Sequence, residues 1–376
     1  MKYFSSRFAL LFASIFLTFS ASAFSATKQF PNITGQTLFQ LKADRVLSTK
    51  VKGVSPNNAY AYVEPRFSLN FNKNWSLKTE WQIYPSSSLT TRNATYPERT
   101  RTFLSNQRGF KPEDTGLLIE ELKAQFEDED MKFFVGKFDP SYGTAYKQNK
   151  RIGVFSTDIT RDYEIREKLG GGVTALLEGA QITFNTFFND TTGLSGSING
   201  RSKERRSDGL AGNTGTLSSY TFSMEAEKLF GYDNWFYNLG YRSLGVDNSN
   251  DIARAREDGY LLGSEYLFKI GSNTSIIPFA EVSKISNFTG ARGRNATYTT
   301  VALIGKYSSW TTSISQILRS INASSAIPKV RDHQLQVSVG YKFTDNLALD
   351  VSRADIKESN KSAVLFGTML SYVYKY

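Results

Sequence analysis

The sequence predicts an all-β fold, a transmembrane antiparallel barrel of about 16 strands, within a range of roughly 14 to 18. Apolar and polar residues alternate over many segments of the chain, and tight turns and long polar connections separate these segments in turn. Successive side chains of a strand point to opposite faces, so each segment has one apolar and one polar face. In a barrel the apolar faces meet lipid and the polar faces line the interior.

Residues 1–23 are expected to be a cleaved signal peptide, and residues 24–376 a single barrel domain. Lys2 and Arg7 precede the apolar run 8–19, which ends at Ala21-Ser22-Ala23. That run is shorter than the ~18 residues of a membrane-spanning helix. Cleavage after Ala26 is the alternative. Loss of Lys2 and Arg7 reduces the 45 Lys and Arg to 43 against 35 Asp and Glu, a net charge of about +8.

The composition narrows the class further. The chain has no Cys, 40% hydrophobic residues and 14% aromatic residues, including 20 Tyr. We therefore expect no disulfide scaffold, and we expect neither a metal nor a cofactor. A barrel accounts for moderate hydrophobicity with many aromatic residues, because only alternate residues face lipid and aromatic girdles mark the interfaces. A soluble all-β or solenoid protein is the alternative that composition leaves open.

The strands of the first half follow from alternation and turns. In residues 59–71, for example, Val63 and Phe67 share one face while Glu64 and Arg66 share the other. Turns rich in Gly, Asn, Asp and Ser suit tight hairpins. We expect strands at 36–46, 59–71, 75–83, 116–126, 131–138, 168–178 and 180–189.

The second half continues the same pattern. We expect strands at 218–229, 234–245, 259–270, 274–285, 296–307, 309–318, 331–344, 347–356 and 362–376. An even number places both ends of the barrel domain on one side, with short turns toward the periplasm and long loops outside. The long connections are expected at 47–58, 85–115, 139–167, 190–217, 246–258, 286–295, 319–330 and 357–361.

The last strand carries an apolar face that ends in Tyr372, Tyr374 and Tyr376. It resembles the terminal strand of Gram-negative outer-membrane β-barrels. This resemblance implies that the strand closes the barrel and is read by the insertion machinery.

Charged residues on the polar faces indicate a wet interior. Ionised side chains are costly in hydrocarbon, so they must face inward. An interior of about 16 strands is wide enough for an aqueous channel. The lumen-facing candidates are Glu64, Arg66, Lys78, Glu80, Glu121, Lys123 and Arg242.

The third long connection, 139–167, is a candidate pore constriction. Its position resembles that of the third loop of general porins, which folds into the barrel, and Gly136 to Gly143 resembles the strand-to-loop junction of phosphate- and sugar-selective porins. Opposed charges there would set ion selectivity. An external loop with mutually paired charges is the alternative. The constriction candidates are Lys147, Lys150, Arg151, Asp158, Arg161, Asp162 and Glu164.

The resemblance to Gram-negative porins implies an outer-membrane channel for passive diffusion of small hydrophilic solutes and ions, commonly a homotrimer. The positive charge suggests a weak anion preference. Lipopolysaccharide and other outer-membrane lipids are expected partners, through basic residues such as Arg201 and Arg205, and nucleic acid is not. A structural or adhesive barrel and an outer-membrane hydrolase are the alternatives. We expect no enzyme, because the single His, His333, falls on a lipid-facing position.

Overall fold

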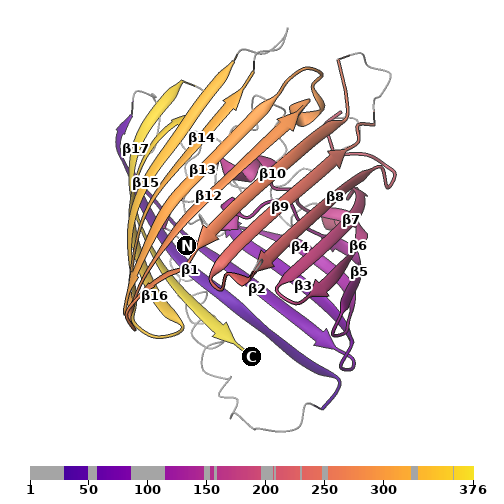
Figure 1. The fold of residues 1–376 in the computed structure, drawn as a ribbon, viewed down its shortest axis with the longest axis horizontal. Helices are drawn as coiled ribbons and strands as arrows, with labels where there is room; N and C mark the ends of the chain where they lie inside the picture. The colour runs from indigo at the N-terminus through magenta and orange to yellow at the C-terminus, as the bar shows by residue number, and fades with distance from the viewer. Residues whose placement is uncertain are drawn as a thin grey trace, which may run out of the picture.

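Figure 1 shows a ring of inclined strands that closes on itself, and this all-β barrel confirms the predicted fold class. The structure is a computed structural model. It describes residues 29–49, 57–85, 115–147, 153–155, 159–195, 206, 209–228, 231–247, 253–322, 329–358 and 360–376. No helix within these ranges is long and apolar enough to cross a bilayer.

The strands lie close to their predicted positions. Those of the first half are β1 (Asn32–Thr49), β2 (Asn57–Asn70), β3 (Trp75–Pro85), β4 (Thr115–Glu127), β5 (Met131–Phe138), β6 (Lys168–Leu177), β7 (Ala180–Asn189) and β8 (Ser219–Glu227). The others are β9 (Trp235–Leu244), β10 (Glu257–Tyr266), β11 (Phe268–Ile270), β12 (Thr274–Ser286), β13 (Ala296–Tyr307), β14 (Trp310–Ile321), β15 (Val330–Lys342), β16 (Leu347–Glu358) and β17 (Lys361–Lys375).

The 17 strands fill 16 positions in the barrel. Strands β10 and β11 both pair with β12 and are interrupted only at Leu267, where we predicted one continuous strand. Neighbouring strands are antiparallel throughout the sheet. The last strand pairs with the first from Gln36 opposite Lys375 to Thr49 opposite Ala363, which closes the ring.

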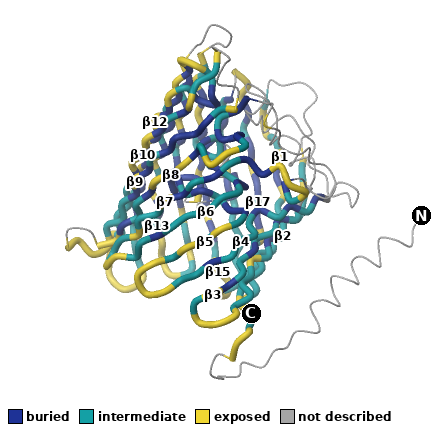
Figure 2. The backbone as a smooth tube through the Cα atoms, turned by 90° about the vertical axis from the view of Figure 1, so that its right-hand side faces the viewer, coloured by how far each residue is buried: buried dark blue, intermediate teal, exposed yellow. Residues whose placement is uncertain are grey.

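Exposure alternates along the strands as a barrel requires. On β15, Val337 and Val339 are 49% and 42% exposed, whereas Gln334 and Gln336 are 1% exposed. Apolar side chains therefore face outward and polar side chains face the interior. Figure 2 shows the same alternation of buried and exposed positions along the strands.

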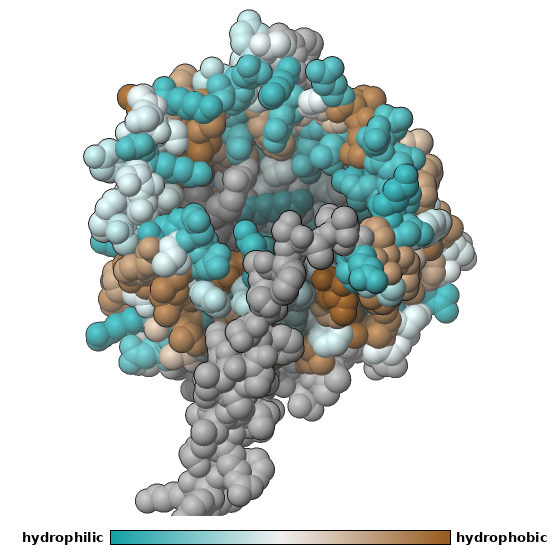
Figure 3. Space-filling view, turned by 90° about the horizontal axis from the view of Figure 1, so that it is seen from below, coloured by the Kyte–Doolittle hydropathy of each residue, from teal (hydrophilic) through white to brown (hydrophobic). Residues whose placement is uncertain are grey.

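The two ends of the barrel differ in their connections. One end, here the turn end, has tight turns such as 71–74 and 343–346, together with the start of β1 and the end of β17. The opposite end, the loop end, carries the long connections. The expected long connection 357–361 is much shorter, because β16 extends to Glu358 and β17 begins at Lys361. Figure 3 views the turn end and shows hydrophilic side chains around a central hollow.

Candidate functional site

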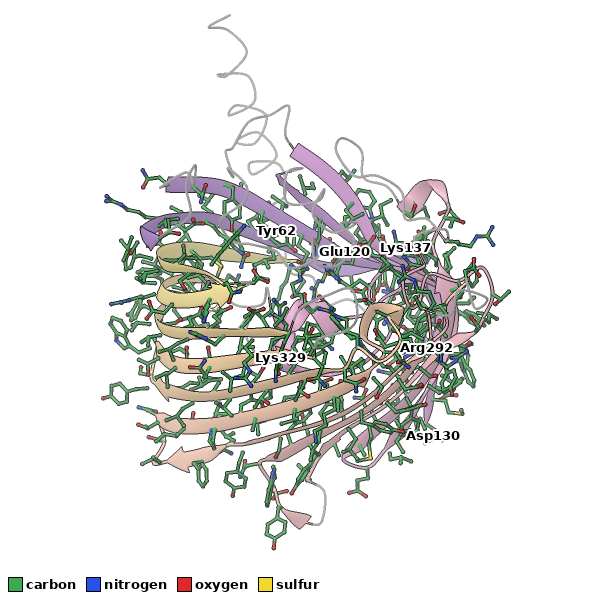
Figure 4. The ribbon with its side chains drawn as sticks, turned by 90° about the horizontal axis from the view of Figure 1, so that it is seen from above. Tyr62, Glu120, Asp130, Lys137, Arg292 and Lys329 are labelled. Atoms are coloured by element: carbon green, nitrogen blue, oxygen red, sulfur yellow. The ribbon has the colours of Figure 1, made fainter. Side chains whose placement is uncertain are left out.

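The described parts of segment 139–167 lie within the ring of strands, where Figure 4 shows their helical turns from above. The segment follows β5 at the loop end and includes the short helix η3 (Thr160–Tyr163). Its apolar side chains are buried against inward-facing residues of β9, β10, β12, β13 and β14. The cluster includes Tyr142, Ala145, Ile159, Tyr163 and Ile165 from the segment, and Leu244, Leu261, Phe279, Tyr298 and Ile317 from the wall.

Glu281 of β12 holds two parts of this segment at once. Its Oε2 accepts hydrogen bonds from the backbone N–H of Thr144 at 2.7 Å and of Ala145 at 3.0 Å, and from Thr144 Oγ1 at 3.0 Å. Its Oε1 accepts from the Tyr163 hydroxyl at 2.7 Å. The Asn238 amide of β9 donates to Oε2 from 3.3 Å. With 2% exposure, Glu281 is a buried acceptor that joins both arms of the segment to one point on the wall.

Arg242 of β9 forms a second attachment point. Its Nη1 donates to the carbonyl oxygen of Tyr163 at 2.7 Å, and its Nη2 lies 2.6 Å from Glu257 Oε1. Its guanidinium group lies 4.7 Å from the ring centre of Tyr142, whose hydroxyl is 2.9 Å from Ser283 Oγ. Burial raises the pKa of Tyr142 to about 12. Arg242 therefore faces the interior, where it supports the segment.

Asp162 is attached to a buried arginine. Arg319 of β14 pairs with Asp162 and Asp332, and its Nη2 lies 3.0 Å from Glu358 Oε1. The Tyr298 hydroxyl donates to Asp162 Oδ2 at 3.1 Å. A guanidinium group shared by three carboxylates is strongly held, since a buried charge must be paired. Asp162 therefore anchors η3 to the wall.

Residues 153–155 reach the wall farther round the ring. The backbone N–H of Val154 donates to Ser352 Oγ at 2.9 Å, and that of Phe155 donates to Gln336 Oε1 at 3.0 Å. A Cβ on Gly367 of β17 would lie 2.6 Å from Phe155 Cζ, so glycine makes room for this ring. The segment thus contacts the wall from β9 to β17.

The opposite wall, β2 to β4, presents paired charges to the interior. Arg66 pairs with Glu64 and lies 2.9 Å from Glu80 Oε1, and Lys123 Nζ lies 2.8 Å from Glu121 Oε2. Tyr62 donates a hydrogen bond to Glu64, and Gln82 donates one to Glu120. Tyr62 and Glu120 are labelled in Figure 4, on the inner side of this wall. The wall therefore combines acidic and basic groups.

The segment brings further charges toward this wall. Arg161 Nε and Arg166 Nε lie 3.2 and 3.3 Å from Glu164 Oε2. Asp139 Oδ1 accepts from the backbone N–H of Glu167 at 2.7 Å. Burial of its carboxyl group, together with the nearby charges of Glu120, Glu164 and Glu121, raises the pKa of Asp139 well above its ordinary value.

The remaining predicted residues lie elsewhere. Lys147 is exposed, with Nζ 5.7 Å from the ring centre of Tyr146, while Lys150, Arg151 and Asp158 lie outside the described residues. Lys78 Nζ lies 3.7 Å from Glu127 Oε2 near the turn end. Glu281, Arg319 and Glu120 were not among the residues predicted from the sequence. Glu281 alternates with outward-facing Ala280 and Val282, a signal that could have revealed it, whereas Arg319 lies one residue beyond the predicted strand.

Lys137 is another buried charge that sequence reasoning missed. Its Nζ lies 3.3 Å from both Glu167 Oε2 and Asp190 Oδ2, and it donates to the carbonyl oxygen of Leu194 at 2.7 Å. This cluster ties the end of segment 139–167 to the connection that follows β7.

His333 lies apart from the polar residues beside it in sequence. It is exposed on the outward alternation of β15, whereas Asp332 and Ser338 are buried on the inward alternation. Asp332 also pairs with Arg319. The outward His and these inward groups therefore do not form a catalytic arrangement. Across the residues that the structure describes, no group of His, Asp and Glu is suited to hold a metal ion.

Solved structures share this architecture over nearly the whole chain. Pseudomonas aeruginosa OccK1 (OpdK) matches with a TM-score of 0.53 and 9% identity, covering 92% of this chain and 99% of that one. Salmonella typhi OmpF in complex with daunomycin matches with a TM-score of 0.55 and 13% identity, covering 91% and 97%. The chain has the fold of the outer-membrane porins.

Acinetobacter baumannii OccAB2 shows the same porin fold, with a TM-score of 0.52 and 8% identity, covering 92% of this chain and 98% of that one. No protein-family model matches the chain, and no curated protein does. At such identities the likeness is one of porin fold.

Proposed function

We propose that the chain is an outer-membrane porin that forms a water-filled channel for passive diffusion of small hydrophilic solutes and ions. The observation that carries the proposal is the charged interior of a closed barrel, in which the wall of β2 to β4 and an inserted segment, with Arg161 and Glu164, both carry ion pairs. A purely structural barrel would have no need of charged groups on both sides of its interior, because burying them is costly.

Segment 139–167 is the constriction in this proposal. It is attached to the wall from β9 to β17, and at its start the backbone N–H of Asp139 donates to Glu121 Oε1 of β4 at 3.4 Å. Opposed acidic and basic groups on the segment and on the wall of β2 to β4 would set a size limit and a transverse field. The paired charges on each side favour weak rather than strong ion selectivity.

Conductance in a planar lipid bilayer tests the channel. The refolded chain without residues 1–23 should give discrete steps of nanosiemens order, as expected of a wide aqueous pore. A correctly folded barrel that gives no steps would contradict the channel and would favour the structural or adhesive alternative. Replacing His333 by Ala should leave the conductance unchanged, since this side chain faces outward.

A weak preference for anions is the finer part of the proposal, and the charge of about +8 on residues 24–376 supports it. Changing Lys147, Lys150 and Arg151 to Glu should move the reversal potential in a salt gradient toward cation preference. An unchanged potential would remove these three residues from the pore lining.

The assembly and the location belong to the same proposal. We place the chain in the outer membrane of a Gram-negative cell as a homotrimer in contact with lipopolysaccharide, after export and removal of residues 1–23. Conductance steps that occur in groups of three would support the trimer, and single independent steps would contradict it.

A further inference from the structure

Basic side chains gather on one part of the outer wall. Arg45 of β1, Arg331 and His333 of β15, and Arg353 and Lys357 of β16 all fall on the outward alternation of their strands. Strands β15, β16, β17 and β1 are consecutive neighbours in the sheet. We call these five residues the basic sector.

Strand register brings the members of the basic sector together. His333 lies directly opposite Lys357 on the neighbouring strand. Arg353 lies opposite Phe366 of β17, and Phe366 lies opposite Arg45 of β1. With strands about 4.8 Å apart, the four strands place these side chains within a width of about 15 Å.

The charge of this sector is strongly positive. Four Lys or Arg side chains accompany one outward carboxylate, Asp355, which leaves +3 with His333 neutral. Arg353 and Asp355 are 62% and 44% exposed and lie 3.5 Å apart, so this pair does not shield the guanidinium group from its surroundings. On the other side of the barrel, the outward residues of β6 to β9 include no Lys, Arg, Asp or Glu.

All five residues lie in the loop-end halves of their strands. A Lys or Arg on the lipid face costs about 2–4 kcal/mol at the bilayer midplane, and about 0–1 kcal/mol near the interface. Long basic side chains avoid this cost by extending toward the head groups. The position and charge of the sector therefore suit an anionic head group at the loop-end surface.

We propose that the basic sector binds the phosphate groups of lipopolysaccharide in the leaflet at the loop end. The inference rests on the outer-membrane location given in the proposed function. A second copy of the chain fits less well, because the same face of another copy would repel the sector, and the outward residues of β6 to β9 offer it no carboxylate. A phosphorylated lipid supplies the opposite charge and accepts several hydrogen bonds from Arg and Lys.

Binding of purified lipid A to the folded barrel in detergent tests this site. The probes are bisphosphorylated lipid A and the same lipid without phosphate. The test variant is Arg353→Gln with Lys357→Gln, and the matched control is Lys284→Gln, an outward basic residue in the loop-end half of β12, outside the sector. Heat-modifiable migration on a gel verifies that each variant is folded, and Arg353→Gln alone replaces the double variant if the latter fails to fold.

We expect wild type to bind the bisphosphorylated lipid more tightly than the dephosphorylated one. Each basic residue near a charged membrane surface contributes about fivefold in affinity, so the double variant should bind about 25-fold more weakly and Arg353→Gln alone about fivefold more weakly. Lys284→Gln should bind as wild type does.

Unchanged affinity in the test variant, or equal binding of both lipids, would overturn the site. So would a change of oligomeric mass in the variant with lipid binding intact, because the sector would then be a contact between copies. Conductance is measured separately on the same samples. A wild type that binds the phosphorylated lipid but gives no conductance steps would contradict the channel and leave the lipid site standing.

Discussion

Single buried side chains fix the position of the inserted segment. Glu281 accepts hydrogen bonds from Thr144, Ala145 and Tyr163, which are separated in sequence but meet at one carboxylate. Arg319 holds Asp162 in a similar way. Because a buried polar group is costly when left unpaired, each of these two side chains holds parts of the segment that are distant from it in sequence.

Replacing Glu281 by Ala should release both arms of the segment. Each hydrogen-bond donor left without an acceptor costs about 1–3 kcal/mol, so the free energy of unfolding should fall by roughly 3 kcal/mol or more. We also expect larger and noisier open-channel current in planar bilayers. Glu281→Gln keeps an acceptor oxygen, so its free energy of unfolding and its open-channel current should lie between those of Glu281→Ala and wild type. A quiet, unchanged current in Glu281→Ala would show that other contacts suffice to hold the segment.

Asp139 should make stability depend on pH. Its pKa is raised in the folded state, so folding favours the protonated form. The resulting contribution is complete below the ordinary pKa of a free Asp, about 3.9, and is lost as the pH rises through the raised value. Asp139→Asn cannot ionise, so the stability lead of wild type over this variant should shrink with rising pH. Urea unfolding in detergent across a pH series measures this difference, and parallel curves would contradict it.

Strands are the elements that sequence alone predicts well. A period of two is a local pattern, and an apolar outer face with a polar inner face produces it, so the predicted strands 131–138 and 296–307 match the structure. The interruption at Leu267 and the continuation of β14 to Ile321 were not predicted, because neighbouring strands in the sheet determine where a strand stops.

The candidate site was less predictable for a related reason. Position along the chain indicated segment 139–167, yet the partners of its charges come from distant strands. Asp162 was a pore candidate, but Arg319, more than a hundred residues later, attaches it to the wall. Such pairings have no periodicity in sequence.

The terminal strand gives a prediction at the element scale. Deleting residues 372–376 would leave residues 36–39 of β1 without the partners that now hydrogen-bond to them. Unpaired backbone groups are not tolerated in hydrocarbon, so the detergent-resistant form should disappear. Tyr374→Ala with Tyr376→Ala keeps the backbone pairing and should still migrate as a heat-modifiable barrel. A truncated chain that remains heat-modifiable would show that closure does not need this segment.

The whole molecule has two distinct ends, and the proposed function assigns the loop end to the cell exterior. The natural chain has no Cys, so introduced thiols report on orientation without background. Lys329 is exposed at the loop end, and Asp345, with a 98% exposed side chain, lies in a turn at the other end.

In intact cells a maleimide carried on a polyethylene glycol chain too large to pass the pore should label Lys329→Cys and spare Asp345→Cys. After lysis both should react, which controls for accessibility of the thiols. Labelling of only Asp345→Cys in intact cells would show that the turn end, and not the loop end, faces the cell exterior.

The pairing of β1 with β17 also constrains how the protein is made. The seam joins the first and the last strand of the barrel, so a chain released early from the ribosome keeps two open sheet edges. The ring can therefore close only after β17 has been synthesised. A truncated chain keeps its unpaired strand edges, and we expect proteases to degrade it before it can form an open pore.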